Sequence, residues 1–191
     1  MELSNREFWT FVHGMVLGSL FLLAFSGGLA GLYSLRAEWL TSTGLRERML
    51  RLRWGISVMA VVAWATVLTG TWIVYPWYRE NLSETEVDRY AGCEGLQAPN
   101  EACSPRDFLL SQVSGDTESW HTFGMEWKEH VAWIAPMLAT AAAFITVYYG
   151  RSLADSPFLR RLVICLFVGA FAVAGIAGLF GALITKTAPI T

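Results

Sequence analysis

The sequence predicts an all-α integral membrane protein, a four-transmembrane-helix bundle. The chain of 191 residues is 54% hydrophobic and 16% charged, whereas soluble domains average about 45–50% and about 25%. Four runs hold no charged side chain, and each reaches the ~20 residues that cross a hydrocarbon core. Trp and Tyr side chains gather at the ends of these runs, as expected at a membrane interface. The runs are 8–35, 54–78, 131–150 and 162–185.

We expect these runs to give spans of about 8–35, 54–78, 129–150 and 162–185, within a single membrane domain of residues 1–191. The segment 79–128 is then a long loop between the second and third spans. Small residues recur in the first and last spans, which allows close packing within the bundle or against another subunit.

The distribution of arginine predicts the orientation of the bundle. The two short connections are basic, whereas the long segment 79–128 is acidic. Basic loops face the cytoplasm, so we expect both termini and the loop 79–128 outside, in a bacterial inner (plasma) membrane. The arginines concerned are Arg36, Arg46, Arg48, Arg51 and Arg53 in the first connection, and Arg151, Arg160 and Arg161 in the last.

Two of the three cysteines, Cys93 and Cys103, lie in the expected outer loop. In an oxidising compartment we expect them to form a disulfide, which would stabilise the loop by roughly 2–3 kcal/mol; two free thiols are the alternative. Cys165 lies in the fourth span and is interpreted as a small core residue. The sequence has no Cys-x-x-Cys-His, which excludes a covalently attached c-type haem.

Two histidines, His13 and His130, lie at what we expect to be the same depth, on helices that both enter from the outside. An imidazole in hydrocarbon is costly and usually marks a site. The first and third helices of an up-down bundle run parallel at diagonal corners, where a flat macrocycle can stand between them. We therefore predict that His13 and His130 ligate the iron of one b-type haem near the extracytoplasmic side.

The neighbours of both histidines fit a porphyrin. Gly14 follows His13 and leaves room for a ring, while Trp133 and Met137 share a helical face with His130 and could pack on it. A backbone carbonyl or Glu126 could fix the tautomer of the ligand imidazole. Propionates could pair with Lys128 or Arg79.

Other interpretations of the histidines stay open. They could form hydrogen bonds between helices, serve a quinone or proton-relay site, or bind another metal together with neighbouring residues. The last set is His121, Met125, Glu126 and His130. On one continuous helix His121 and His130 lie on opposite faces, so sharing a metal needs a break, which Gly124 could supply.

The sequence lacks a phosphate-binding glycine loop, a His-Glu-x-x-His motif and a Gly-x-Ser-x-Gly turn. The net charge of −2 and the absence of a basic stripe outside the expected cytoplasmic loops exclude nucleic acid as a partner.

In its architecture alone, a four-span bundle with His13 and His130 near one surface resembles the membrane cytochrome b subunits of respiratory oxidoreductases. The resemblance implies a non-catalytic electron-transfer subunit with haem b, which relays electrons between a quinone pool and a periplasmic redox protein. Its partners would be other subunits of the complex and lipids, and a quinone is a further candidate ligand. The alternative is a cofactor-free accessory subunit of a membrane respiratory or photosynthetic complex.

Overall fold

The computed structural model describes residues 5–35, 41–76 and 116–187. These residues are helical and contain no strand. They include four helices that are long and apolar enough to cross a membrane: Phe8–Tyr33, Thr43–Val74, Ser119–Tyr149 and Pro157–Ile184. The prediction of four such helices is confirmed. Arg79 and the expected disulfide partners Cys93 and Cys103 lie outside the described residues.

Each of the first three long helices is interrupted by one π-helical turn. The elements in chain order are α1 (Asn5–Phe11), η1 (Val12–Val16), α2 (Leu17–Tyr33), α3 (Ser42–Thr69), η3 (Gly70–Val74), α7 (Asp116–Glu126), η5 (Trp127–Val131), α8 (Ile134–Tyr149), α9 (Ser152–Asp155) and α10 (Pro157–Thr187).

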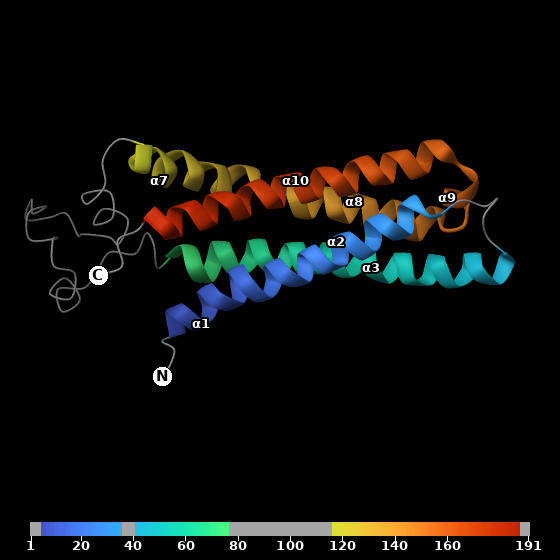
Figure 1. Cartoon of the computed structure of the whole chain (residues 1–191), viewed down its shortest axis with the longest axis horizontal. Helices are drawn as coiled ribbons and strands as arrows, with labels where there is room; N and C mark the ends of the chain where they lie inside the picture. Colours follow the sequence, from blue (N-terminus) through green and yellow to red (C-terminus); the bar gives the residue numbers. More distant parts are fainter. Residues whose placement is uncertain (1–4, 36–40, 77–115, 188–191) are drawn as a thin grey trace, which may run out of the picture.

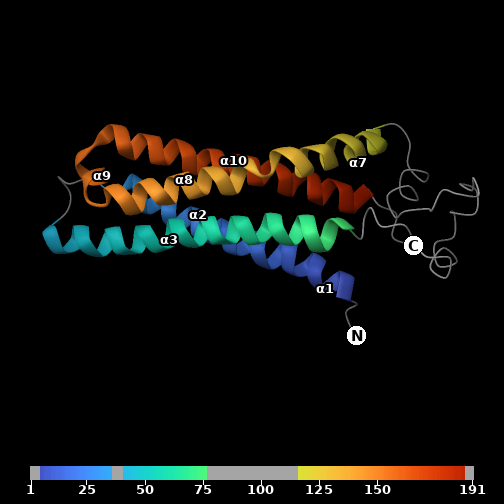
Figure 2. The same ribbon diagram turned by 180° about the vertical axis from the view of Figure 1, so that it is seen from behind.

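The helices form an elongated bundle (Figures 1 and 2). Helix α3 packs between α2 and α8, and α10 packs on α8 and on α2. Helices α2 and α8 therefore occupy diagonal corners. One end of the bundle, called the α7 end below, holds α1, η3, α7 and the last turns of α10; the opposite end, with α9 and the start of α3, is called the α9 end.

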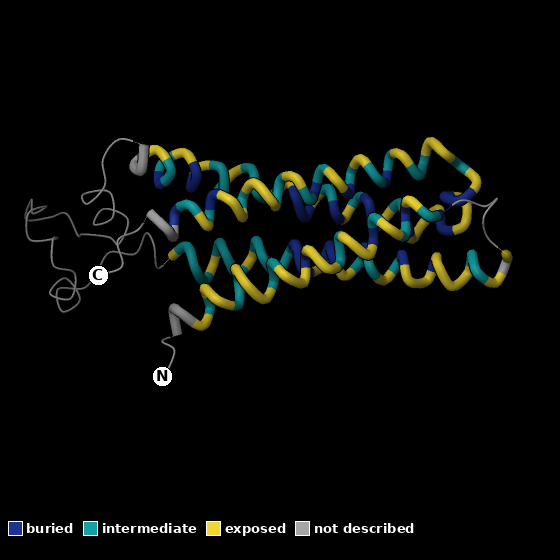
Figure 3. The backbone as a smooth tube through the Cα atoms, in the orientation of Figure 1, coloured by how far each residue is buried: buried dark blue, intermediate teal, exposed yellow. Residues whose placement is uncertain are grey.

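The buried apolar core lies toward the α9 end. It is built from the second half of the first helix, the first two thirds of α3, the second half of α8 and the first half of α10. Its fully buried side chains are Leu32, Leu35, Ile56, Met59, Ala139, Ala142, Leu153, Val163, Phe167 and Ala170. Figure 3 shows exposed positions along all of the long helices. Many of them carry large apolar side chains, as expected where lipid replaces water. Cys165, which the sequence suggested as a core residue, is exposed as well.

Glycine permits the closest helix contact in this core. A Cβ built at Gly28 would lie 2.5 Å from Cζ of Phe167, so α2 and α10 approach here only because position 28 has no side chain. The Phe167 ring also stacks on Phe25, with ring centroids 5.1 Å apart. This contact joins the first helix to the last.

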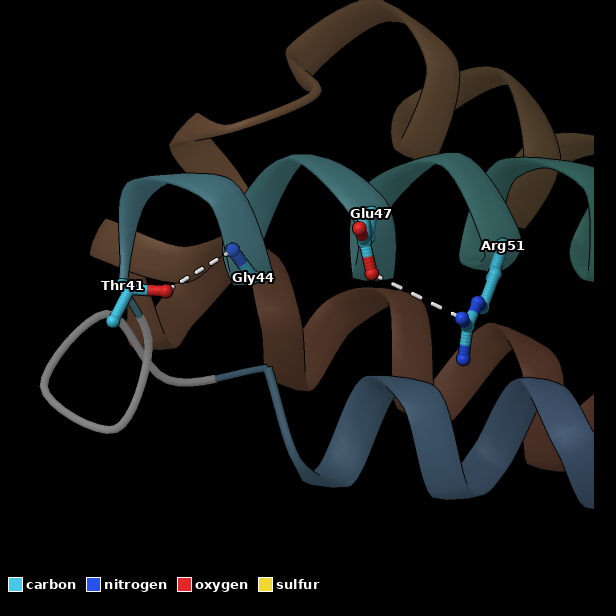
Figure 4. Close-up of polar contacts among 4 residues, drawn as sticks. All are labelled: Thr41, Gly44, Glu47 and Arg51. Atoms are coloured by element: carbon cyan, nitrogen blue, oxygen red, sulfur yellow. Dashed lines mark hydrogen bonds and ion pairs between the residues drawn. The ribbon is translucent and has the colours of Figure 1, made fainter.

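Helix α3 begins well before its apolar run. The side chain of Thr41 caps it by accepting a hydrogen bond from the backbone N–H of Gly44 at 3.2 Å, and Glu47 pairs with Arg51 one turn later at 3.9 Å (Figure 4). The predicted span began at residue 54. Several arginines that were expected in the connection therefore lie on the first turns of a helix.

Arginines also cap the end of α2. Nη1 of Arg160 donates to the carbonyl of Leu35 at 2.9 Å, and Nη1 of Arg48 donates to the carbonyl of Ser34 at 3.2 Å. Cations at a helix C-terminus satisfy carbonyls that have no partner within the helix. Arg48 and Arg160 therefore stabilise the end of α2, in addition to any effect of the basic residues on the orientation of the bundle.

The third long helix also starts earlier than predicted. Residues 116–128 were expected to belong to the loop, but α7 and η5 continue directly into α8. The polar side chains of α7 are typical of a loop, yet a helix that extends past the apolar run can place such side chains on an exposed face. Glu126, for example, is exposed.

A polar candidate site at the α7 end

The three π-helical turns lie toward the same end of the bundle and contact its other elements. In the described residues η1 packs on α3, α1 on η3, and η5 on α10. Turns of this kind are rare and occur frequently at functional sites. They contain or adjoin the predicted histidines, because His13 lies in η1 and His130 in η5. This end of the bundle is therefore the candidate site.

His13 faces into the bundle and contacts the junction of α3 and η3. Its Nδ1 lies 3.1 Å from Oγ1 of Thr69. Its ring covers Gly70, where a Cβ would lie 2.8 Å from Cε1 of the ring. A side chain at position 70 would therefore displace the imidazole.

The hydrogen bonds of Thr69 define the tautomer of a neutral His13 ring. The Thr69 hydroxyl donates its only hydrogen to a backbone carbonyl, either that of Ala65 at 2.7 Å or that of Thr66 at 3.1 Å. When the hydroxyl donates to one of these carbonyls it can only accept from His13, and Nδ1 of a neutral ring then carries the proton while Nε2 keeps its lone pair. Nε2 is the atom that can bind a metal.

His130 has the same tautomer but a different environment. Its Nδ1 lies 3.1 Å from the backbone carbonyl of Glu126, one turn earlier, and 3.4 Å from Oε2 of the same residue. A carbonyl oxygen only accepts, so Nδ1–H donates and Nε2 again keeps its lone pair. The His130 side chain is 71% exposed.

The described structure does not bring the two predicted ligands together. His13 points to α3 on the inside of the bundle, whereas His130 lies on the exposed face of η5 and is bonded to its own helix. Shared ligation of one iron by both rings stays a prediction.

Lys128 reaches the interface between η5 and α10. A Cβ built at Gly181 would lie 3.2 Å from its Nζ, so the ammonium group rests against the backbone of α10. It is also close enough to His13 to interact with it electrostatically. Among the described residues no carboxylate forms an ion pair with Lys128.

Trp127 precedes Lys128 and faces the same interface. Its ring lies 5.8 Å from the ring of Phe180, which precedes Gly181 on α10. Its Nε1 is buried and finds no acceptor in the described part of the chain. A buried N–H without a partner is uncommon and needs an explanation.

The other predicted site residues are spread over different surfaces. Gly14 is exposed, with open space around its Cα. Trp133 packs edge-on against Trp64 and Trp72 of the second long helix, with ring centroids 6.2 and 6.0 Å away. Met137 is 56% exposed. None of these three is seen against the ring of His13.

The alternative metal set is divided between two faces. His121 and Met125 are buried, whereas Glu126 and His130 are exposed. Helix α7 passes through Gly124 without a break. Within the described ranges no three His, Cys, Asp or Glu side chains are placed to hold a metal ion. The positions of these four residues therefore do not support a metal ion that they would bind together.

Two features of the site were not predicted from the sequence. Thr69 lies in an apolar run and was not singled out. Pairing the first helix with the second would have placed this threonine opposite His13 and so indicated a hydrogen bond between them. Trp127 lies near the end of an apolar run, a position typical of an interface tryptophan, and its sequence context does not indicate that Nε1 is buried.

The described residues form a bundle of four helices that are long and apolar enough to cross a membrane, with His13 and Lys128 turned toward neighbouring helices at one end. No protein-family model matches the chain. Searches of curated proteins and of solved structures likewise find no similar protein.

Proposed function

We propose that the protein is a non-catalytic subunit of a membrane electron-transfer complex that binds one b-type haem at the α7 end, through His13 and His130. The observation that carries the proposal is the pair of Nδ1 contacts made by the imidazole rings of His13 and His130. In each ring Nδ1 lies 3.1 Å from an oxygen atom, and donation of the Nδ1 proton to that oxygen would leave the lone pair on Nε2. Imidazoles that ligate metals are usually fixed in this way.

The distribution of the core supports a ligand at this end. The main cluster of buried apolar side chains stops in the half of the bundle nearer α9. His13, in contrast, contacts the hydroxyl of Thr69 and the backbone at Gly70. A polar interior in a bundle of this kind is where cofactors of helix bundles bind.

Ligation by both rings requires a change at His130. Its ring must leave its exposed position and turn toward the bundle, which gives up one hydrogen bond worth about 1 kcal/mol. Because the ring is 71% exposed, little packing holds it in its present position. The haem would supply the redox chemistry, while the chain supplies the ligands, their orientation and a dry environment. Electrons would pass between a quinone pool and a redox partner.

The proposal is tested by adding haem to the purified full-length chain and to His130→Ala. We expect the wild type to bind one haem per chain with a low-spin, two-imidazole spectrum. His130→Ala should keep the haem but become high-spin, because one axial position loses its imidazole. A low-spin spectrum unchanged in His130→Ala would remove this residue as a ligand, and a wild type that binds no haem would remove the proposal.

A second candidate, a cofactor-free assembly subunit, is favoured by the glycines that face out of the bundle. Gly14, Gly27, Gly175 and Gly178 are exposed, and a Cβ at any of them would meet nothing within 4 Å. Glycines on a transmembrane surface allow a second helix to approach closely. Within the described residues, a side chain at any of these four positions would not meet another helix of this chain.

Bulky substitutions at these glycines test the second candidate. We expect Gly175→Leu with Gly178→Leu to leave the thermal unfolding midpoint of the isolated chain unchanged within 2–4 °C, roughly the effect of 1 kcal/mol at this size. Copurification of other subunits from native membranes should be lost. If copurification persists at the wild-type level, the assembly role of this face is excluded.

A further inference from the structure

We propose that Arg53 is the centre of a phosphate-binding site between α3 and the end of α8, and that the phosphate belongs to the headgroup of an anionic phospholipid. The site lies at the α9 end of the bundle, away from His13 and His130. It is therefore independent of the function proposed above.

Arg53 reaches from α3 to the end of α8. A Cβ built at Gly150, which follows the last residue of α8, would collide with Nη2 of Arg53. Gly150 also has a φ of 51°, in the region that favours glycine. The absence of a side chain at position 150 thus leaves a place beside the backbone, and the guanidinium of Arg53 occupies it.

The guanidinium of Arg53 has no partner in the described part of the chain. Its Nε is buried without an acceptor, and no ion pair is made to it. Arg48 and Arg160, in contrast, donate to carbonyls at the end of α2. Arg53 as a whole is partly exposed, and Nε is its buried nitrogen. Nη1 and Nη2 are therefore the donors that a ligand from outside the chain can reach.

The depth of Arg53 in the membrane matches that of lipid phosphates. Arg53 immediately precedes the apolar run 54–78, and Gly150 ends the apolar run 131–150. The neighbouring rings of Trp54 and Tyr148 are exposed, and such rings prefer the level of the headgroups. The guanidinium therefore lies where hydrocarbon gives way to headgroups.

The surroundings of this site fit a lipid better than a free phosphate ion. Exposed apolar side chains continue from the level of Arg53 into the membrane on both helices. A lipid whose phosphate binds Arg53 can lay its acyl chains on them, whereas a free ion gains nothing from this surface. These side chains are Val58 and Val61 on α3, and Phe144 and Val147 on α8.

The charge of the α9 end favours an anionic lipid. Residues 41–53 and 150–161 contain seven arginines but only two carboxylates, Glu47 and Asp155, and Glu47 already pairs with Arg51. A guanidinium matches the geometry of a phosphate with two parallel N–H donors. Basic sites between membrane helices bind anionic headgroups, and the predicted orientation puts this end on the cytoplasmic side, whose leaflet carries such lipids.

The test titrates phosphatidylglycerol or phosphatidylcholine into the full-length chain in a neutral detergent, and counts bound lipids by native mass spectrometry. We expect the wild type to bind one phosphatidylglycerol at least about tenfold more tightly than phosphatidylcholine, the effect of one charge-assisted hydrogen bond. In Arg53→Gln the two affinities should become equal. Arg53→Lys keeps the charge but lacks the planar fork, so it should retain only part of the preference.

Arg51→Gln is the matched control, since it removes the same charge from the same helix, but from an exposed side chain that pairs with Glu47. It should keep the wild-type preference. If Arg53→Gln does not fold, Arg53→Lys compared with Arg51→Lys decides in the same way. An equal loss of preference at positions 51 and 53 would assign the effect to overall charge and overturn the site.

Two further outcomes contradict the lipid assignment. Equal binding of both lipids by the wild type would overturn the preference for an anionic headgroup. Displacement of phosphatidylglycerol by millimolar inorganic phosphate, in the wild type but not in Arg53→Gln, would reassign the site to a soluble phosphate.

Discussion

Replacing His13 by alanine is expected to abolish haem binding by the full-length protein. His13 is the predicted ligand that already faces the inside of the bundle, and its Nε2 is held ready by the bond from Nδ1 to Thr69. Removal of Thr69 as an acceptor, in Thr69→Val, should lower the affinity about 10–100-fold, the usual effect of losing the partner of a ligand imidazole. Both effects are measured by titrating haem into the purified variants.

Thr140→Val is the control for the threonine variant. Thr140 also lies on a membrane helix and accepts a hydrogen bond from Nε1 of Trp64 at 3.0 Å, but it has no contact with His13 in the described structure. The haem affinity of the Thr140→Val variant should equal that of the wild type. If His13→Ala binds haem as the wild type does, ligation by His13 is excluded.

Replacing Gly28 by alanine is expected to destabilise the fold by about 1–3 kcal/mol, the usual range for overpacking a close contact. The new methyl group would lie 2.5 Å from Phe167, whose ring is fully buried and stacked on Phe25. Because the ring is fully buried, it can yield only by displacing its neighbours or by separation of the two helices. The thermal unfolding midpoint in detergent measures the effect.

The neighbouring glycine provides a matched control. Gly27 is exposed, and a Cβ there would meet nothing within 4 Å. Gly27→Ala should therefore keep or raise the unfolding midpoint, since alanine favours a helix over glycine by about 1 kcal/mol. Equal losses of stability in both variants would contradict the packing described here between α2 and α10.

The sequence predicted the four long helices well because their apolar runs are long and free of charge. The helices that carry two of the predicted spans begin before those spans: α3 begins at residue 42 and α7 at residue 116, whereas the spans were predicted from about 54 and 129. The cause is the same in both cases: a helix continues beyond its apolar run, and charged residues such as Arg51 and Glu126 then occupy its exposed face. Charge predicts the limits of an apolar run better than the limits of a helix.

The candidate site was predictable only in part. His13 was identified as a candidate because it is a polar residue in an apolar run. The sequence did not indicate, however, which face of its helix His130 occupies. Its direction depends on the π-helical turn η5, which changes the register of the helix around it. Such turns are set by packing between helices, so the separation of His13 from His130 and the burial of Trp127 appear only in three dimensions.

The central claim is that an imidazole inside the α7 end ligates the iron of a haem. The most direct measurement is the electron paramagnetic resonance spectrum of the oxidised wild-type protein, purified from cells supplied with haem. The account predicts a low-spin ferric signal of a haem with two imidazole ligands, absent in His13→Ala. A purified protein that folds, contains no iron and shows no such signal would contradict it.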